Sequence, residues 1–197
     1  MSVLSVDWQA GAEPPFEQAV SNARVVALEI LSLLKTLKAY GLTEEQRIYI
    51  IGHGLGAHIA GYVGHMHAVH KITGLDPTGA YFEHMPPVVR LDPSDAQFVE
   101  VLHTDAFSGR SQGTQTSMGH VDFFLNGAKQ QTNCNDTSPF SSFTKLDRNS
   151  LKEGDILPAC SHKRSFKYFI ESARNKNCEY IGFECYSYKD FEEVIEF

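Results

Sequence analysis

The stretch Ile48-Tyr-Ile-Ile-Gly-His-Gly-Leu-Gly-Ala-His58 contains the pattern that decides the fold. It opens with the β-branched and aromatic residues of a buried strand and continues into small residues that predict a helix. A strand that turns sharply into a helix through closely spaced glycines has the layout of a nucleophile elbow, G-x-S-x-G. Gly54 stands at the apex, where that motif has its serine. The apex therefore has no hydroxyl.

The glycines at this turn have two interpretations. One is an ordinary glycine-rich strand–helix turn, which in some proteins binds a phosphate, although the G-x-G-x-x-G spacing of a dinucleotide-binding turn is absent. The other is a hydrolase elbow in which glycine replaces the nucleophilic serine. The turn alone does not separate them, and the rest of the chain has to decide.

The chain of 197 residues has the length of one domain, and its pattern alternates strands with helices. Apolar runs predict strands at 2–6, 47–51, 72–75, 98–103 and 121–125, and helical periodicity predicts helices at 17–40, 57–67 and 163–173. The predicted buried stripe of the long helix is Val26, Ile30, Leu33, Leu34 and Leu37. In the helix after the elbow, Ala57, Ala60, Gly61 and Gly64 predict close packing on a sheet. This alternation indicates an α/β fold, with a mostly parallel sheet and helices on both faces.

Charge and hydropathy exclude several classes of partner. The net charge of −7 counts against nucleic acid and anionic membrane surfaces. No apolar run approaches the roughly 18 residues of a membrane span, so we expect no transmembrane segment. The opening residues, Met1 to Trp8, lack the basic and apolar regions of a signal peptide.

The four cysteines are Cys134, Cys160, Cys178 and Cys185, and none forms a C-x-x-C pair. A zinc knuckle or a thioredoxin-like motif is therefore excluded. Sequential pairing, 134 with 160 and 178 with 185, would indicate an oxidising compartment. Composition equally allows four buried or free thiols in a cytosolic protein.

Five further motifs follow the elbow. They are Ile72-Thr-Gly-Leu-Asp-Pro-Thr-Gly79, Val89-Arg-Leu-Asp-Pro-Ser-Asp-Ala96, Val101-Leu-His-Thr-Asp105, Gly119-His-Val-Asp-Phe-Phe-Leu-Asn-Gly127 and Ala159-Cys-Ser-His-Lys-Arg-Ser-Phe-Lys-Tyr168. In their order and spacing they resemble the neutral, pancreatic-type lipases, which are α/β-hydrolases, and the resemblance extends from residue 3 to about residue 188. It favours the elbow interpretation.

The resemblance implies roles for the residues around the elbow. In the family's order of serine, acid and histidine, Asp76 is the acid that orients His162, the general base. Leu55, which follows the apex, would donate its backbone N–H to the oxyanion. Taken alone, Asp76 is better read as a turn carboxylate before Pro77, and His162 as a partly exposed loop histidine.

The resemblance also implies a domain organisation. Residues 1–197 correspond to a partial lipase domain that lacks the family's earliest strands, with their second oxyanion donor, and its C-terminal β-sandwich domain. Residues 134–160 correspond to a lid closed by a disulfide between Cys134 and Cys160. Because the family is secreted, we also expect a disulfide between Cys178 and Cys185.

A calcium site is the next implication. In the family the carboxylates matching Asp92 and Asp95 bind Ca²⁺ together with two backbone carbonyls, which here belong to Pro87 and Arg90. Calcium prefers such hard oxygen ligands. Asp-Pro-Ser-Asp is also a helix start, with Asp92 as the N-cap and Pro93 in the first turn, and both interpretations can hold at once.

The activity that the resemblance implies is hydrolysis of carboxylic esters in triacylglycerols or phospholipids, at a lipid–water interface and outside the cell. Gly54 predicts that this activity is impaired, because acyl transfer in this class needs a covalent serine ester. The alternative is a non-catalytic lipid-binding or yolk-type homologue. Five histidines near the elbow lack metal-ligand spacing and are expected to be structural: 53, 58, 65, 67 and 70.

Overall fold

The computed structural model describes residues 2–106, 111–134, 160–175, 177 and 180–195. The α-helices are α1 (Phe16–Ala39), α2 (Leu55–Met66), α3 (Cys160–Arg174) and α4 (Tyr188–Ile195). The strands are β1 (Tyr49–His53), β2 (Lys71–Leu75), β3 (Phe98–His103) and β4 (Val121–Phe124). Short 3₁₀ turns complete the fold: η1 (Gln9–Gly11), η2 (Glu45–Arg47), η3 (Pro87–Val89), η4 (Pro93–Asp95) and η5 (Leu125–Ala128).

The four strands form one parallel sheet in the order β1-β2-β3-β4. In its register Gly52 pairs with Gly74, and Gly74 pairs with Val101. The carboxyl ends of parallel strands meet at one edge of the sheet, which is where α/β proteins place their ligands. The loops after β1, β2 and β3 therefore lie next to one another, and they contain the apex glycine and the predicted acid.

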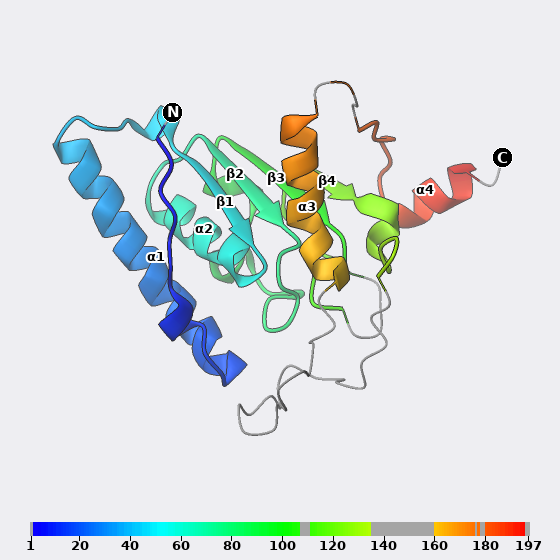
Figure 1. Ribbon diagram of the computed structural model, residues 1–197, viewed down its shortest axis with the longest axis horizontal. Coiled ribbons are helices and arrows are strands. Elements are labelled where there is room, and N and C mark those ends of the chain that lie inside the picture. Colours follow the sequence, from blue (N-terminus) through cyan, green and yellow to red (C-terminus); the bar gives the residue numbers. More distant parts are fainter. Residues whose placement is uncertain (1, 107–110, 135–159, 176, 178–179, 196–197) are drawn as a thin grey trace.

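Helices cover both faces of the sheet (Figure 1), as the alternating pattern predicts. On one face Ile72 and Val99 lie in the same buried core as residues of α1 and α2. Successive strand residues point to opposite faces, so His53 faces away from that core. The His53 ring contacts Phe166 of α3, with centroids 5.5 Å apart. Helix α3 therefore packs on the opposite face.

The buried stripe of α1 differs from the predicted one. Its buried residues are Ala19, Ala23, Ala27, Leu31 and Leu34. Of the predicted stripe only Leu34 is buried, and Leu33 is 44% exposed. Alanines at a spacing of four lie one above another on a helix, and their small side chains let a neighbouring helix approach closely. Most of the buried face of α1 therefore consists of small residues rather than of the larger ones that were predicted.

The region before α1 also differs from the prediction. Residues 2–6 form no strand and are exposed. Their composition favours a strand, but a strand needs a neighbour to bond with, and the described sheet pairs none with them. Helix α3 begins at Cys160, three residues earlier than predicted, and α4 has no counterpart among the predicted helices. No described helix is both long enough and apolar enough to cross a membrane.

Candidate active site

The turn between β1 and α2 has the backbone conformation of a nucleophile elbow. Gly54 lies between β1 and α2 with φ 57° and ψ −120°, and its N–H donates to the Leu75 carbonyl at 3.0 Å. A residue with a side chain at such angles costs about 1–3 kcal/mol, whereas glycine adopts them readily. Gly52 is required for another reason, because a β-carbon there would lie 2.2 Å from the Gly56 carbonyl oxygen.

The predicted acid and base meet beside this turn. Asp76 follows β2 and is fully buried, and its Oδ2 accepts a hydrogen bond of 2.6 Å from Nδ1 of His162. Its other oxygen accepts from the backbone N–H groups of Thr104 and Asp105, at 2.7 and 3.0 Å. The carboxylate is therefore held from both sides. It fixes the orientation of the His162 ring and leaves Nε2 directed away from Asp76.

The Nε2 atom of His162 lies against the apex glycine. A β-carbon built on Gly54 would be 2.9 Å from this nitrogen and 3.4 Å from Oγ1 of Thr78. A serine at position 54 would therefore present its hydroxyl to the base after a small retreat of the imidazole. Leu55 follows as the first residue of α2, where its N–H has no acceptor within the helix. The geometry is that of a Ser-His-Asp triad without the hydroxyl.

His53 is a second histidine in the site, and sequence reasoning assigned it only a structural role. Its ring lies 4.2 Å from the ring of His162, and its Nε2 is 3.2 Å from the His162 carbonyl oxygen. Burial, and then the charge of His162, lower the pKa of His53 to about 4. It is therefore neutral at physiological pH. Its position directly before the apex is the sequence signal for this contact.

His58 supports the same region from inside α2, as a structural histidine. It is fully buried and stacked on Phe82, with ring centroids 3.7 Å apart. Its Nδ1 accepts from the Leu91 N–H at 3.1 Å, and its Nε2 donates to the Thr78 carbonyl at 2.9 Å. Burial lowers its pKa to about 4. Because one ring nitrogen must accept, the structure requires the neutral ring.

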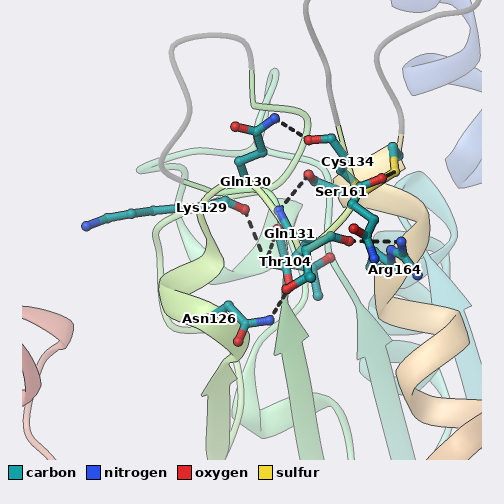
Figure 2. Close-up of a disulfide and its surroundings, with 11 residues drawn as sticks. Thr104, Asn126, Lys129, Gln130, Gln131, Cys134, Ser161 and Arg164 are labelled. Carbon is teal, nitrogen blue, oxygen red and sulfur yellow. Dashed lines mark hydrogen bonds between the residues drawn. A yellow bond between two sulfur atoms is a disulfide. The ribbon is translucent and has the colours of Figure 1, made fainter.

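A buried glutamine, Gln131, links the segments that carry Asp76 and His162, through bonds to Thr104 and Ser161 (Figure 2). Gln131 donates through its backbone N–H to Ser161 Oγ at 3.0 Å, and Ser161 directly precedes the base. The Gln131 side chain donates to the Thr104 carbonyl at 2.8 Å, and the Thr104 N–H holds Asp76. Motif spacing did not identify Gln131, because it lies outside the quoted motifs.

The predicted disulfide between Cys134 and Cys160 is present, with an S–S distance of 1.98 Å (Figure 2). It ties the loop after η5 to the first turn of α3, two residues before His162. The residues between these cysteines, 135–159, which include the predicted lid, lie outside the described residues.

The predicted pairing of Cys185 with Cys178 is wrong for this structure, because Cys185 is a free, exposed cysteine. It lies in a stretch without helix or strand, at 180–185, whose side chains are exposed. Packing therefore does not hold this thiol against another part of the chain. Cys178 itself lies outside the described residues.

The loop expected to hold calcium forms the predicted N-cap, on a 3₁₀ turn. Asp92 Oδ1 accepts from the Ser94 N–H at 3.0 Å, and Asp95 Oδ2 accepts from the Asp92 N–H at 2.9 Å. This capping box uses one oxygen of each carboxylate. The other oxygens lie farther from basic side chains, Asp92 Oδ2 at 4.0 Å from the Arg90 guanidinium and Asp95 Oδ1 at 3.8 Å from the His65 ring.

Burial of this loop disfavours a bare carboxylate at Asp95. Asp95 is 3% exposed, and burial raises its pKa to about 7. The loop sits on two glycines of α2, since a β-carbon on Gly64 would lie 2.0 Å from the Asp95 carbonyl oxygen and one on Gly61 would lie 2.9 Å from its carboxylate. These glycines therefore contact this loop, in addition to the sheet contact predicted for them.

The donor chemistry of the loop is compatible with calcium. In the described part of the chain, no three His, Cys, Asp or Glu side chains converge on one point. Calcium can complete its shell with backbone carbonyls, and the family resemblance implies those of Pro87 and Arg90 for this role. The oxygens left over from the capping box and these carbonyls are all hard ligands.

Comparisons with known proteins identify the family of this chain. The family model described as Lipase matches residues 1–196. Pancreatic triacylglycerol lipase of Oryctolagus cuniculus is 41% identical over 97% of this chain and 42% of its own length. Inactive pancreatic lipase-related protein 1 of Homo sapiens is 40% identical over 98% of this chain and 41% of its own length. Pancreatic lipase-related protein 2 of Rattus norvegicus is 38% identical over 98% and 42%, respectively.

The chain thus spans about two fifths of the length of these relatives. Its parallel sheet, its elbow turn and its buried carboxylate–histidine pair are the features of an α/β-hydrolase. The family match covers nearly all of the chain, and we conclude that it belongs to the lipase family.

Proposed function

We propose that this chain is a lipase homologue whose ester hydrolysis is impaired, and that it binds lipid in the site where its relatives cleave it. One observation carries the proposal. Gly54 occupies the nucleophile's backbone position, with Nε2 of His162 2.9 Å from where a β-carbon would lie, and supplies no hydroxyl. A relative whose name describes it as inactive supports an impaired member of this family.

The size of the impairment follows from the chemistry of acyl transfer. His162 can act as a general base only by taking a proton from a nucleophile. In a serine hydrolase with this triad, loss of the nucleophile lowers turnover by about 10⁶. The backbone N–H of Leu55 can still stabilise an oxyanion. Residual effects of this kind accelerate hydrolysis by about 10³–10⁴ over the reaction in water. We therefore expect negligible turnover of lipid esters.

The initial rate on a chromogenic short-chain ester tests this proposal. The unmodified chain should hydrolyse the ester no faster than His162→Ala, and Gly54→Ser should raise the rate. The gain should disappear in the double variant Gly54→Ser/His162→Ala, because the new hydroxyl depends on the base. A rate in the unmodified chain that His162→Ala removes would overturn the proposal, since another nucleophile or a water would then be active.

The restored activity should be partial. The new side chain must displace the imidazole of His162 by a few tenths of an ångström. The site residues also include one identified oxyanion donor, Leu55, and each donor is worth about 10²–10³ in rate. Lipid binding without hydrolysis is therefore the function that we propose for this site.

Two further properties accompany the proposed function. We propose that the chain acts outside the cell at a lipid–water interface, which the disulfide between Cys134 and Cys160 supports, since such bonds persist in oxidising compartments. We also propose that Ca²⁺ binds the loop of Asp92 and Asp95, with a structural effect, because this loop leads into the start of β3, whereas Gly54 and Asp76 follow the carboxyl ends of β1 and β2.

A further inference from the structure

Residues 126–128, after β4, form a left-handed turn. Asn126, Gly127 and Ala128 have φ values of 50°, 69° and 47°. Asparagine and glycine adopt this region readily, whereas an alanine adopts it only when the surrounding structure holds it there. Ala128 is fully buried, and its carbonyl accepts a hydrogen bond from the Ala106 N–H at 2.7 Å. The conformation of this turn therefore depends on the groups that contact it.

The inner side of the turn is bonded to Gln131. The Gln131 side chain accepts from the Asn126 amide at 2.8 Å and donates to the Lys129 carbonyl at 3.1 Å. The same side chain donates to the Thr104 carbonyl, and the Gln131 N–H donates to Ser161 Oγ (Figure 2). A change in the turn would therefore alter the bonds of both segments that carry the candidate acid and base.

Helix α4 covers the outer side of the turn (Figure 1). A β-carbon on Gly127 would overlap the Tyr188 hydroxyl, so the ring of Tyr188 lies directly against this glycine. Lys129 Nζ is 5.2 Å from the centroid of the Tyr188 ring and 2.8 Å from Oε1 of Glu192. The hydrogen bond between Lys129 and Glu192 raises the pKa of the amine and lowers the pKa of the carboxyl group. Figure 2 shows that the Lys129 side chain extends away from Gln131, toward the outside of the turn.

The contacts of α4 are weak enough to be reversible. The side chains of Lys129 and Glu192 are 53% and 47% exposed, and exposed ion pairs contribute little to stability. Tyr188 is only partly buried, and no described side chain of α4 belongs to the buried core. Elements with few buried contacts open locally, at a free energy well below that of global unfolding. Helix α4 can therefore leave the turn while the sheet stays folded.

We propose that α4 is a releasable element that stabilises the left-handed turn and, through Gln131, the placement of His162 beside Gly54. With α4 docked, the turn is held between Tyr188 on the outside and Gln131 on the inside. With α4 released, Ala128 relaxes from its left-handed conformation and the bonds of Gln131 loosen. The inference concerns the geometry of the site, so it holds whether the site binds lipid or cleaves esters.

Two tyrosines provide a matched test of the docking. Tyr188→Ala removes the contact with the turn, whereas Tyr186→Ala changes a side chain that is fully exposed. Amide hydrogen exchange of Ala106, whose N–H is bonded to the turn, should become at least fivefold faster in Tyr188→Ala only. Exchange of Val101, in the buried middle of β3, should stay the same in both variants, because release of α4 is local. Docking is refuted if Ala106 exchanges equally fast in the two variants.

The ion pair gives a second, independent test of the docking. Glu192→Lys places two like charges together and should make exchange of Ala106 at least twofold faster. The double variant Lys129→Glu/Glu192→Lys should restore slow exchange, since opposite charges again face each other. Glu193→Lys is the matched control, because it makes the same change of charge at a residue whose ion pair, with Lys189, lies within α4. Equal effects of the two single substitutions on α4 would contradict the docking.

The His162 ring reports the coupling between α4 and the site. In Tyr188→Ala the NMR signal of the proton between His162 and Asp76 should shift, and in Tyr186→Ala it should not. If exchange of Ala106 becomes faster while this signal stays unchanged, the coupling is refuted. Neither result depends on the ester hydrolysis that tests the proposed function, so the two proposals can fail separately.

Discussion

The backbone N–H of Gln131 donates to Ser161 Oγ at 3.0 Å, and this bond connects the loop after η5 to the residue before the base. The Gln131 side chain is bonded to the carbonyls of Thr104 and Leu125, and it accepts from the Asn126 amide. With 1% exposure, it has no water to replace these partners. One glutamine thus holds the strand end that fixes Asp76 and the helix start that carries His162.

Gln131→Ala is therefore expected to lower the free energy of unfolding by about 2–4 kcal/mol, because it leaves buried carbonyls without donors. Urea unfolding measures the loss. The matched control is the neighbouring exposed Gln130→Ala, which should change stability by less than about 1 kcal/mol. The NMR signal of the proton between His162 and Asp76 should move only in the first variant. Equal losses of stability in Gln131→Ala and Gln130→Ala would contradict the role assigned to Gln131.

Stability should depend on pH through His58. Its pKa is about 4 in the folded chain and 6.5 as the ordinary value, so the unfolded state binds the proton more readily. The contribution of neutral His58 to the free energy of unfolding is fully present above pH 6.5 and is lost as the pH falls toward 4. A tenfold difference in proton affinity between the folded and unfolded states corresponds to about 1.4 kcal/mol, so the loss of stability approaches about 3 kcal/mol.

His58→Asn keeps an acceptor for the Leu91 N–H and removes the titration. It should be less stable than the unmodified chain at pH 7 and should lose less stability between pH 6.5 and 4.5, as measured by urea unfolding. His70→Gln, at an exposed position, should retain the slope of the unmodified chain. An NMR titration in which the His58 ring protonates near pH 6.5 in the folded chain would contradict this assignment.

The disulfide between Cys134 and Cys160 should contribute strongly to stability. The two residues are 26 positions apart, and closing a loop of that length is worth about 3–4 kcal/mol in the chain-entropy description. Cys134→Ser/Cys160→Ser should lose this amount in chemical unfolding. Cys185→Ser should be neutral, because that thiol is free and exposed. Peptide mapping without reductant that finds a free thiol at Cys134 would refute the bond.

Calcium should raise the melting temperature of the chain. A ligand that binds only the folded state stabilises it according to its concentration, and about 1 kcal/mol shifts the melting temperature of a chain this size by roughly 2–4 °C. Asp92→Asn should abolish the shift, and Glu29→Gln, on an exposed part of α1, should preserve it. The calcium assignment fails if calcium followed by chelator leaves the melting temperature of the unmodified chain unchanged.

Local sequence is sufficient to predict the strand–turn–helix around Gly54 and the parallel α/β pattern. These features depend on short-range rules: glycine where backbone crowds a turn, and apolar periodicity. The pairing of Cys134 with Cys160 is predicted from the family resemblance. The meeting of Asp76 with His162 is predicted from family resemblance alone, since 86 positions separate them. No rule of spacing brings two such residues together without a sheet register.

The tertiary structure decided which residues support that pair. The contact of His53 with His162 and the bonds of Gln131 join segments that are distant in sequence, so their partners are fixed only when the strands align. Packing also determined that alanines lie on the buried side of α1 and that Cys185 is exposed. The sequence by itself determined that Gly54 stands at an elbow without a hydroxyl. Only the fold showed that the imidazole of His162 lies against this apex, because the position of a side chain depends on the residues that pack around it.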